Sequence, residues 1–223
     1  MRFDILTLHP EMCEGPLSVS ILGRAADAGL IAFGIHNIRD HGIGKHSTVD
    51  DTPYGGGSGM VMRVDVVDQA IEAVRHEGGR VLLMDAAGAR FTQADAKRLA
   101  AYPQLVLVCG HYEGIDGRVR EHLVDEAFGI GDYVLTGGEL PAMVIADAVA
   151  RMVPGVLGNP DSIVEESFMH GRLEAPPYTR PRAYRGWEVP EVLLSGHHGR
   201  IATWREAQGV ALTRRVRPDL LEE

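Results

Sequence analysis

Short apolar runs alternate with segments of helical periodicity along residues 3–152, and this alternation restricts the fold more than any other feature of the chain. We expect strands at residues 3–8, 31–38, 81–84, 105–109 and 126–130. We expect helices at residues 18–28, 64–76, 92–101, 116–123 and 140–152, the third of them capped by Thr92. Strands that are separated by helices form parallel sheets with helices on both faces. The sequence therefore predicts an α/β fold with a mostly parallel sheet.

Two glycine-rich loops follow predicted strands. Gly110 and Gly114 bound the first, and Gly137 and Gly138 end the second, just before a helix that opens near Pro141. Glycines allow a backbone to approach a ligand closely, and ligands of parallel sheets bind at the carboxyl ends of the strands. The loops therefore predict one site built mostly from main-chain atoms. On the glycines alone, it could hold a nucleotide, a flavin fragment or nothing.

The composition indicates a globular protein of a reducing, cytoplasmic compartment. The chain is 45% hydrophobic and 24% charged, and no apolar run approaches the ~20 residues that cross a bilayer. Residues 1–8 are interpreted as a first strand and not as a signal peptide. Two cysteines are too few for a disulfide framework, and Cys109, at the end of an apolar strand, is expected to be a buried thiol.

Charge is distributed unevenly along the chain. The net charge is -9, which by itself argues against a nucleic-acid partner. Residues 172–217, however, contain nine arginines, four glutamates and no lysine, so this segment carries +5 and the remainder -14. The planar guanidinium group suits phosphate and base contacts. From charge alone, a nucleic-acid surface and an ordinary solvated face are equally good interpretations.

Two long loops and a change in composition suggest the domain organisation. The loops are residues 39–61 and 154–166, and loops of this length are usually functional or disordered. We expect a domain at residues 1–157, a linker at 158–172 and a small helical domain at 173–223. Within the small domain, helices are expected at about residues 200–208 and 211–217.

Several familiar sites are excluded. Residues 55–59 lack the Lys-Ser/Thr of a phosphate-binding P-loop, and no helix begins where a dinucleotide fingerprint requires it. No His, Asp or Glu cluster has metal-ligand spacing, and no Ser-His-Asp arrangement is evident.

Five motifs resemble one family closely. They are residues 51–60, 110–116, 130–141, 177–181 and 192–196. Together they are similar to the bacterial tRNA (guanine-N1-)-methyltransferases, which belong to the trefoil-knotted (SPOUT) methyltransferases, and the resemblance extends from residue 1 to about residue 220. It implies an obligate homodimer with a C-terminal trefoil knot in the α/β domain. It also implies methylation of the guanine just 3′ of the anticodon, with S-adenosyl-L-methionine as donor.

The resemblance also implies which residues bind the cofactor. These are Met84, Gly88, Gly110, Tyr112, Glu113, Gly114, Ile130, Gly131, Asp132, Tyr133, Val134, Leu135, Gly137, Gly138 and Pro141. The backbone of residues 130–135 would grip the adenine. At residues 84–88, where the family usually carries Ser-Pro before a glycine, this chain has Asp85 and Ala86.

Methylation at N1 requires removal of the N1 proton and neutralisation of charge on O6. The family places an aspartate in a linker motif whose counterpart here is Glu166, one methylene longer. The resemblance implies Glu166 as the base and Arg151 as the O6 partner, although Arg151 alone could be a cation at a helix C-terminus. Asp50, Gly59 and Glu113 would hold the guanine.

The arginine-rich part would clamp the anticodon stem-loop, with Tyr178, Tyr184 and Trp187 available to stack on unpaired bases. Trp204 is expected in the small-domain core. Two other functions stay open at this point. One is a related knotted methyltransferase that modifies another RNA position, such as a ribose 2′-hydroxyl. The other is a non-enzymatic RNA-binding module. The need for a divalent ion is not specified by the sequence.

Overall fold

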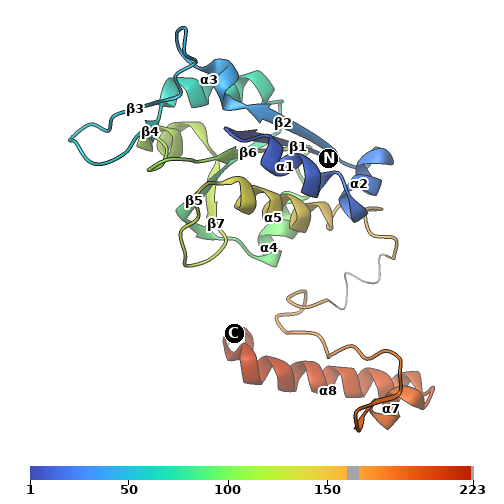
Figure 1. The fold of residues 1–223 in the computed structure, drawn as a ribbon. Helices are drawn as coiled ribbons and strands as arrows, with labels where there is room; N and C mark the ends of the chain where they lie inside the picture. The colour runs from blue at the N-terminus through green and yellow to red at the C-terminus, as the bar shows by residue number, and fades with distance from the viewer. Residues whose placement is uncertain (160–165, 222–223) are drawn as a thin grey trace. The chain divides into compact units, whose positions relative to one another are not determined.

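The protein is described from a computed structural model, which covers residues 1–159 and 166–221. The chain divides into two compact units, Met1–Gly158 and Asn159–Glu223 (Figure 1).

The first unit is built on a five-stranded parallel sheet. Its strands are β1 (Arg2–Thr7), β2 (Ala32–Asn37), β5 (Arg80–Arg90), β6 (Gln104–Cys109) and β7 (Glu126–Gly129). They lie in the order β2-β1-β6-β5-β7, and every pairing is parallel. The predicted α/β class and parallel sheet are confirmed.

Strand β5 is longer than the sequence predicted. It continues past Met84 to Arg90 because its pairing with β7 resumes at Ala89 after a register shift. Gly88 permits this close approach, since a Cβ there would lie 2.5 Å from the backbone nitrogen of Phe128.

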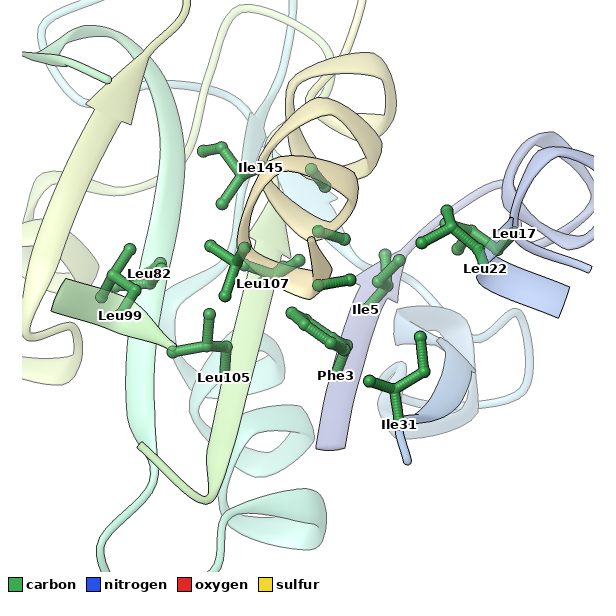
Figure 2. Packing of buried hydrophobic residues seen from close by; sticks show 14 of the residues in the cluster. Phe3, Ile5, Leu17, Leu22, Ile31, Leu82, Leu99, Leu105, Leu107 and Ile145 are labelled. Atoms are coloured by element: carbon green, nitrogen blue, oxygen red, sulfur yellow. The ribbon is translucent and has the colours of Figure 1, made fainter. Parts of the chain in front are cut away.

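Alternating residues of the strands bury both faces of the sheet. In β6, Leu105 and Leu107 point into one core, whereas Val106 and Val108 point into the other. Helices α1 (Glu11–Leu17), α2 (Ser20–Asp27), α4 (Gln93–Leu99) and α5 (Glu139–Ala150) contribute to the first core. Figure 2 shows this packing, with Ile145 of α5 above Leu107.

The second core lies under α3 (Val64–Val74), the 3₁₀ helix η1 (Ile38–His41) and η2 (Val119–Leu123), a single π-helical turn. Helix α3 covers the face opposite α5, which is visible in Figure 1. Two short strands, β3 (Asp50–Asp51) and β4 (Val61–Met62), pair antiparallel beside this layer.

Local signals account for most of these helices. Thr92 caps α4 as predicted, with a reciprocal capping box to Asp95. Helix α1 was not predicted, because Gly15 and Pro16 lie inside its seven residues and lower its intrinsic helix propensity. It forms nevertheless because Cys13 and Leu17 are buried against the first core.

The amino-terminal edge of the sheet contains a buried carboxylate. Asp4 is fully buried and accepts hydrogen bonds from Arg2, Gln104 and His36, each at 2.7 Å. Burial alone would raise the pKa of Asp4, but these bonds outweigh that effect and its pKa is lowered. Gly34 leaves room for the cluster, because a Cβ there would lie 2.3 Å from Asp4 Oδ1.

The second unit consists of a short hairpin and helices. Strands β8 (Ala183–Tyr184) and β9 (Trp187–Glu188) pair antiparallel and precede α7 (Glu191–Leu194), α8 (His198–Val216) and the 3₁₀ helix η3 (Pro218–Leu221).

The expectation of two short helices at about 200–208 and 211–217 is wrong, because α8 is continuous from His198 to Val216. Gly209 lies between the two expected helices, and its missing side chain makes room for packing. A Cβ at this position would lie 2.7 Å from the carbonyl oxygen of Leu173. Thr213 completes the contact, since its hydroxyl accepts from Leu173 N at 2.9 Å and donates to Gly209 O at 2.7 Å.

Candidate functional site

A cavity of about 390 Å³ lies at the carboxyl ends of β6 and β7 and beside β5 at residues 83–86, where β5 stops pairing with β6. Its wall is formed by three segments far apart in the sequence, at residues 83–86, 110–120 and 128–141. This is the edge at which parallel sheets bind ligands, and the volume lies in the range of small-molecule sites.

Thirteen of the fifteen residues predicted to bind the cofactor line this one cavity: Met84, Gly110, Tyr112, Glu113, Gly114, Ile130, Gly131, Tyr133, Val134, Leu135, Gly137, Gly138 and Pro141. The other two, Gly88 and Asp132, are outside its lining. Gly88 lies against β7, and Asp132 is exposed on the loop. Asp85 and Ala86, which depart from the family pattern, line the cavity.

The two glycine loops are in direct contact. Gly138 donates its backbone N–H to Gly110 O at 2.9 Å. A Cβ on Gly138 would lie 2.6 Å from the Cα of Cys109 and 2.9 Å from Gly110 N. The absence of a side chain at Gly138 therefore lets the main chain of the two loops pack in direct contact at the wall of the cavity.

A third glycine loop adjoins the cavity. A Cβ on Gly59 would lie 2.4 Å from Glu113 Cγ, and the backbone N–H of Glu113 donates to Met60 O at 3.1 Å. Met62 donates to Gly114 O at 3.0 Å and pairs with Asp50 across the β3–β4 ladder. The three residues expected to hold the guanine, Asp50, Gly59 and Glu113, are thus joined through one set of backbone contacts.

The two residues expected to act in chemistry belong to different units. Arg151 follows the last turn of α5 and is half-buried in the first unit. Glu166 belongs to the second unit, where its carbonyl accepts from Met169 N at 3.2 Å and its side chain lines a separate cavity. Most of the 154–166 loop, at residues 160–165, lies outside the described residues.

That separate cavity is larger, about 1040 Å³, and is lined entirely by residues of the second unit. Four arginines line it, namely Arg172, Arg180, Arg182 and Arg205. Tyr178 and Trp204 also line it, with their ring centroids 6.2 Å apart. Trp204 is therefore half-buried against this cavity and not in a closed core.

The hairpin of the second unit presents another aromatic pair. The rings of Tyr184 and Trp187 are 6.1 Å apart, and Trp187 is 69% exposed. Exposed aromatic rings beside cationic side chains can stack on unpaired bases, whereas arginines provide contacts to phosphates.

Sequence reasoning did not assign a buried polar cluster beneath the first cavity. Thr7 at the end of β1 donates to Glu139 at 2.6 Å, and both are buried. Burial raises the pKa of Cys13 to about 11, and the charge of Glu139 adds to this effect. Cys109 is free and buried, as predicted, and burial raises the pKa of its thiol well above the ordinary value. The available sequence signal was Glu139 itself, an acid at the start of a strongly apolar helix.

Neither a metal-binding cluster nor a membrane-spanning helix is present in the described residues, 1–159 and 166–221. In this part of the chain, no three His, Cys, Asp or Glu side chains gather in a way that could hold a metal ion. No helix there has the length and apolar character needed to span a bilayer.

Comparison with known proteins agrees with the resemblance in the motifs. The sequence model of the family tRNA (Guanine-1)-methyltransferase TrmD matches residues 1–223. A tRNA (guanine-N(1)-)-methyltransferase of Pelotomaculum thermopropionicum is 58% identical, with 100% of this chain and 90% of the relative aligned. Enzymes of the same name from Chloroflexus aggregans and Geobacter sulfurreducens are 57% and 55% identical, covering 99% and 100% of this chain and 88% and 92% of the relatives. The chain belongs to the tRNA (Guanine-1)-methyltransferase family.

Proposed function

We propose that this protein transfers a methyl group from S-adenosyl-L-methionine to N1 of the guanine immediately 3′ of the anticodon in tRNA, giving 1-methylguanosine. The observation that carries the proposal is the match of the family along the whole chain. The cavity at the sheet edge supports it, because residues from three distant motifs meet there.

The residues present fit S-adenosyl-L-methionine. Gly110 and Gly138 give the cavity a wall of main chain, and the segment 130–135 provides backbone groups for an adenine. When bound, the cofactor supplies an electrophilic methyl group on a sulfonium. The protein's share is to hold the guanine in line with it and to exclude water.

In the proposed mechanism, Glu166 removes the proton from guanine N1, so that the nitrogen lone pair becomes available. Arg151 stabilises the negative charge that develops on O6. Asp50 and Glu113 hold the guanine, with Gly59 giving the neighbouring loop its close approach to Glu113. With the guanine held in this way, the bound cofactor would supply the methyl group that N1 takes up.

The second unit would bind the anticodon stem-loop. Its lining arginines and half-exposed aromatics support this role. In this proposal residues 158–172 link the catalytic domain at 1–157 to the RNA-binding domain at 173–223. The protein works as a cytoplasmic homodimer with a C-terminal trefoil knot, in keeping with the family resemblance.

Methyl transfer to anticodon stem-loops tests the function. We expect transfer to an RNA with guanosine at the target and none with adenosine, which lacks both the N1 proton and O6. Nuclease digestion and mass spectrometry should identify 1-methylguanosine. A 2′-O-methyl product would support the ribose methyltransferase instead, and binding without transfer would support the non-enzymatic module.

The role of Glu166 has a matched test. Glu166→Gln should abolish turnover while the affinity for S-adenosyl-L-methionine stays near that of the wild type. Glu174→Gln is the control, because Glu174 lines the same cavity of the second unit. Retained turnover in Glu166→Gln would show that another group accepts the proton.

A further inference from the structure

Glu139 is a buried carboxylate directly beneath the cofactor cavity, and the mechanism above does not use it. It is the first residue of α5 and only 1% exposed. The amino end of a helix favours a negative charge, which lowers the cost of burying this carboxylate.

Thr7 fixes one oxygen of this carboxylate. Its hydroxyl donates to Glu139 Oε1 at 2.6 Å and accepts from the backbone N–H of His9 at 2.8 Å. The N–H of His9 thus orients the hydroxyl, whose single hydrogen goes to Glu139. The bond joins the end of β1 to the start of α5, 132 residues away in the sequence.

The other oxygen faces the glycine loop. A Cβ on Gly137 would lie 2.3 Å from Glu139 Oε2 and 3.0 Å from His111 Nδ1. The carboxylate and the imidazole therefore both lie against the side of Gly137 where a side chain would be. His111 Nδ1 is buried, and no described residue forms a hydrogen bond with it. Gly137, Gly138 and His111 all line the cofactor cavity.

We infer that Glu139, held by Thr7, is a positioning residue that fixes the 136–138 loop for S-adenosyl-L-methionine. The inference rests on the proposed function. With Thr7 in place, the Glu139 carboxylate cannot rotate without breaking its buried hydrogen bond to Thr7. The 136–138 loop therefore packs against a carboxylate whose position is fixed. A loop already held in its ligand-binding conformation loses less conformational entropy on binding, and affinity rises accordingly.

Thr7→Val tests this step because valine keeps the shape of threonine and removes the hydroxyl. We expect the dissociation constant for S-adenosyl-L-methionine, measured by titration calorimetry, to rise on the order of tenfold. Thr7→Ser retains the hydroxyl and should restore affinity to within about twofold of the wild type. In steady-state assays, KM for the cofactor should rise in Thr7→Val while KM for the tRNA stays unchanged.

Gln104→Met is the matched control for a purely structural effect. Gln104 donates to the buried Asp4 at 2.7 Å and so makes the same kind of long-range bond from β6 to β1, at the opposite edge of the sheet. Both variants should lower the melting temperature, but only Thr7→Val should weaken cofactor binding. Should Thr7→Val fail to fold, Thr7→Ala replaces it, because alanine also removes the hydroxyl that donates to Glu139, and the same rise in the dissociation constant is expected.

The outcomes separate the two proposals, since calorimetry needs no methyl transfer. If the wild type binds S-adenosyl-L-methionine and Thr7→Val binds it with the same dissociation constant, the inference about Glu139 is overturned and the proposed function is not. Equal weakening in Thr7→Val and Gln104→Met would also overturn it. No binding by the wild type would overturn the proposed function, and this inference with it.

Discussion

Gly138→Ala is the sharpest test of the backbone-built cavity. The new methyl group would lie 2.6 Å from the Cα of Cys109, 2.9 Å from Gly110 N and 2.9 Å from Met84 Cβ. Two of these three atoms belong to main chain in the sheet and its following loop, so no flexible side chain can swing away. The backbone contact between Gly138 and residues 109–110 must therefore widen by several tenths of an ångström.

The cost of this opening follows from overpacking. Forcing one methyl group into a well-packed interior costs about 1–3 kcal/mol. If the 136–138 loop moves, the cost falls on binding, and the dissociation constant for S-adenosyl-L-methionine rises about 5- to 150-fold. If the loop stays, the strain falls on the fold and the melting temperature drops by about 2–12 °C.

Calorimetric titration and thermal unfolding, measured on the same preparation, cover both cases. Gly15→Ala is the control, because a Cβ on Gly15 of α1 meets nothing within 4 Å. Gly15→Ala should lower neither the affinity for S-adenosyl-L-methionine nor the melting temperature. A Gly138→Ala protein that matches the wild type in both measurements would refute the argument that the two loops touch through main chain.

Two substitutions and one labelling experiment test the fold around the site. Thr92→Ala removes the cap of α4 and should cost about 1 kcal/mol of stability in urea unfolding. Asp4→Asn should cost about 2 kcal/mol at pH 7. Because the pKa of Asp4 is lowered in the fold, its contribution is present above the unfolded pKa and disappears as the pH falls below about 4, so unfolding curves of the two proteins should converge there. Cys13 and Cys109, buried with raised pKa values, should react with a thiol reagent at pH 8 only after denaturant is added, and rapid labelling of the native protein would contradict their burial.

The parallel sheet could be predicted because its signals are local. Each strand is a short apolar run bounded by turn residues, and the order of strands and helices along the chain implies parallel pairing. The edge that carries the cavity followed from the same reasoning, since the loops at 110–114 and 136–138 come directly after strands or before a helix.

The features that were missed depend on partners distant in sequence. Gly209 looks like a helix break in its own context, but the helix continues because Leu173 needs the space. The second half of β5 exists because β7 resumes pairing with it at Ala89. The Thr7–Glu139 bond spans 132 residues, and no periodicity or local motif predicts such a contact.

The roles of individual site residues came from the resemblance and not from pattern. Arg151 alone is indistinguishable from a cation that stabilises the end of α5. The sequence does not show that Asp50 and Glu113 lie near each other. Their proximity follows from Met62, which pairs with Asp50 and donates its backbone N–H to the carbonyl of Gly114. The structure therefore adds proximity to residues whose chemistry the sequence could only suggest.

The two cavities are lined by different kinds of chemical group, and this difference determines which ligands suit them. In the first unit, the walls at Gly110, Gly114, Gly137 and Gly138 are main chain, whose positions follow from the sheet and its loops. Such a wall offers fixed donors and acceptors at short range, which suits one small molecule of constant shape. In the second unit, the walls are long arginine side chains and aromatic rings, which can adjust to a polymer with a repeating charge. In the proposed function, a donor that is the same in every turnover would bind in the first cavity and the RNA would bind at the second. The division of charge along the chain, +5 within 172–217 and -14 elsewhere, supports this proposal for the carboxyl-terminal unit.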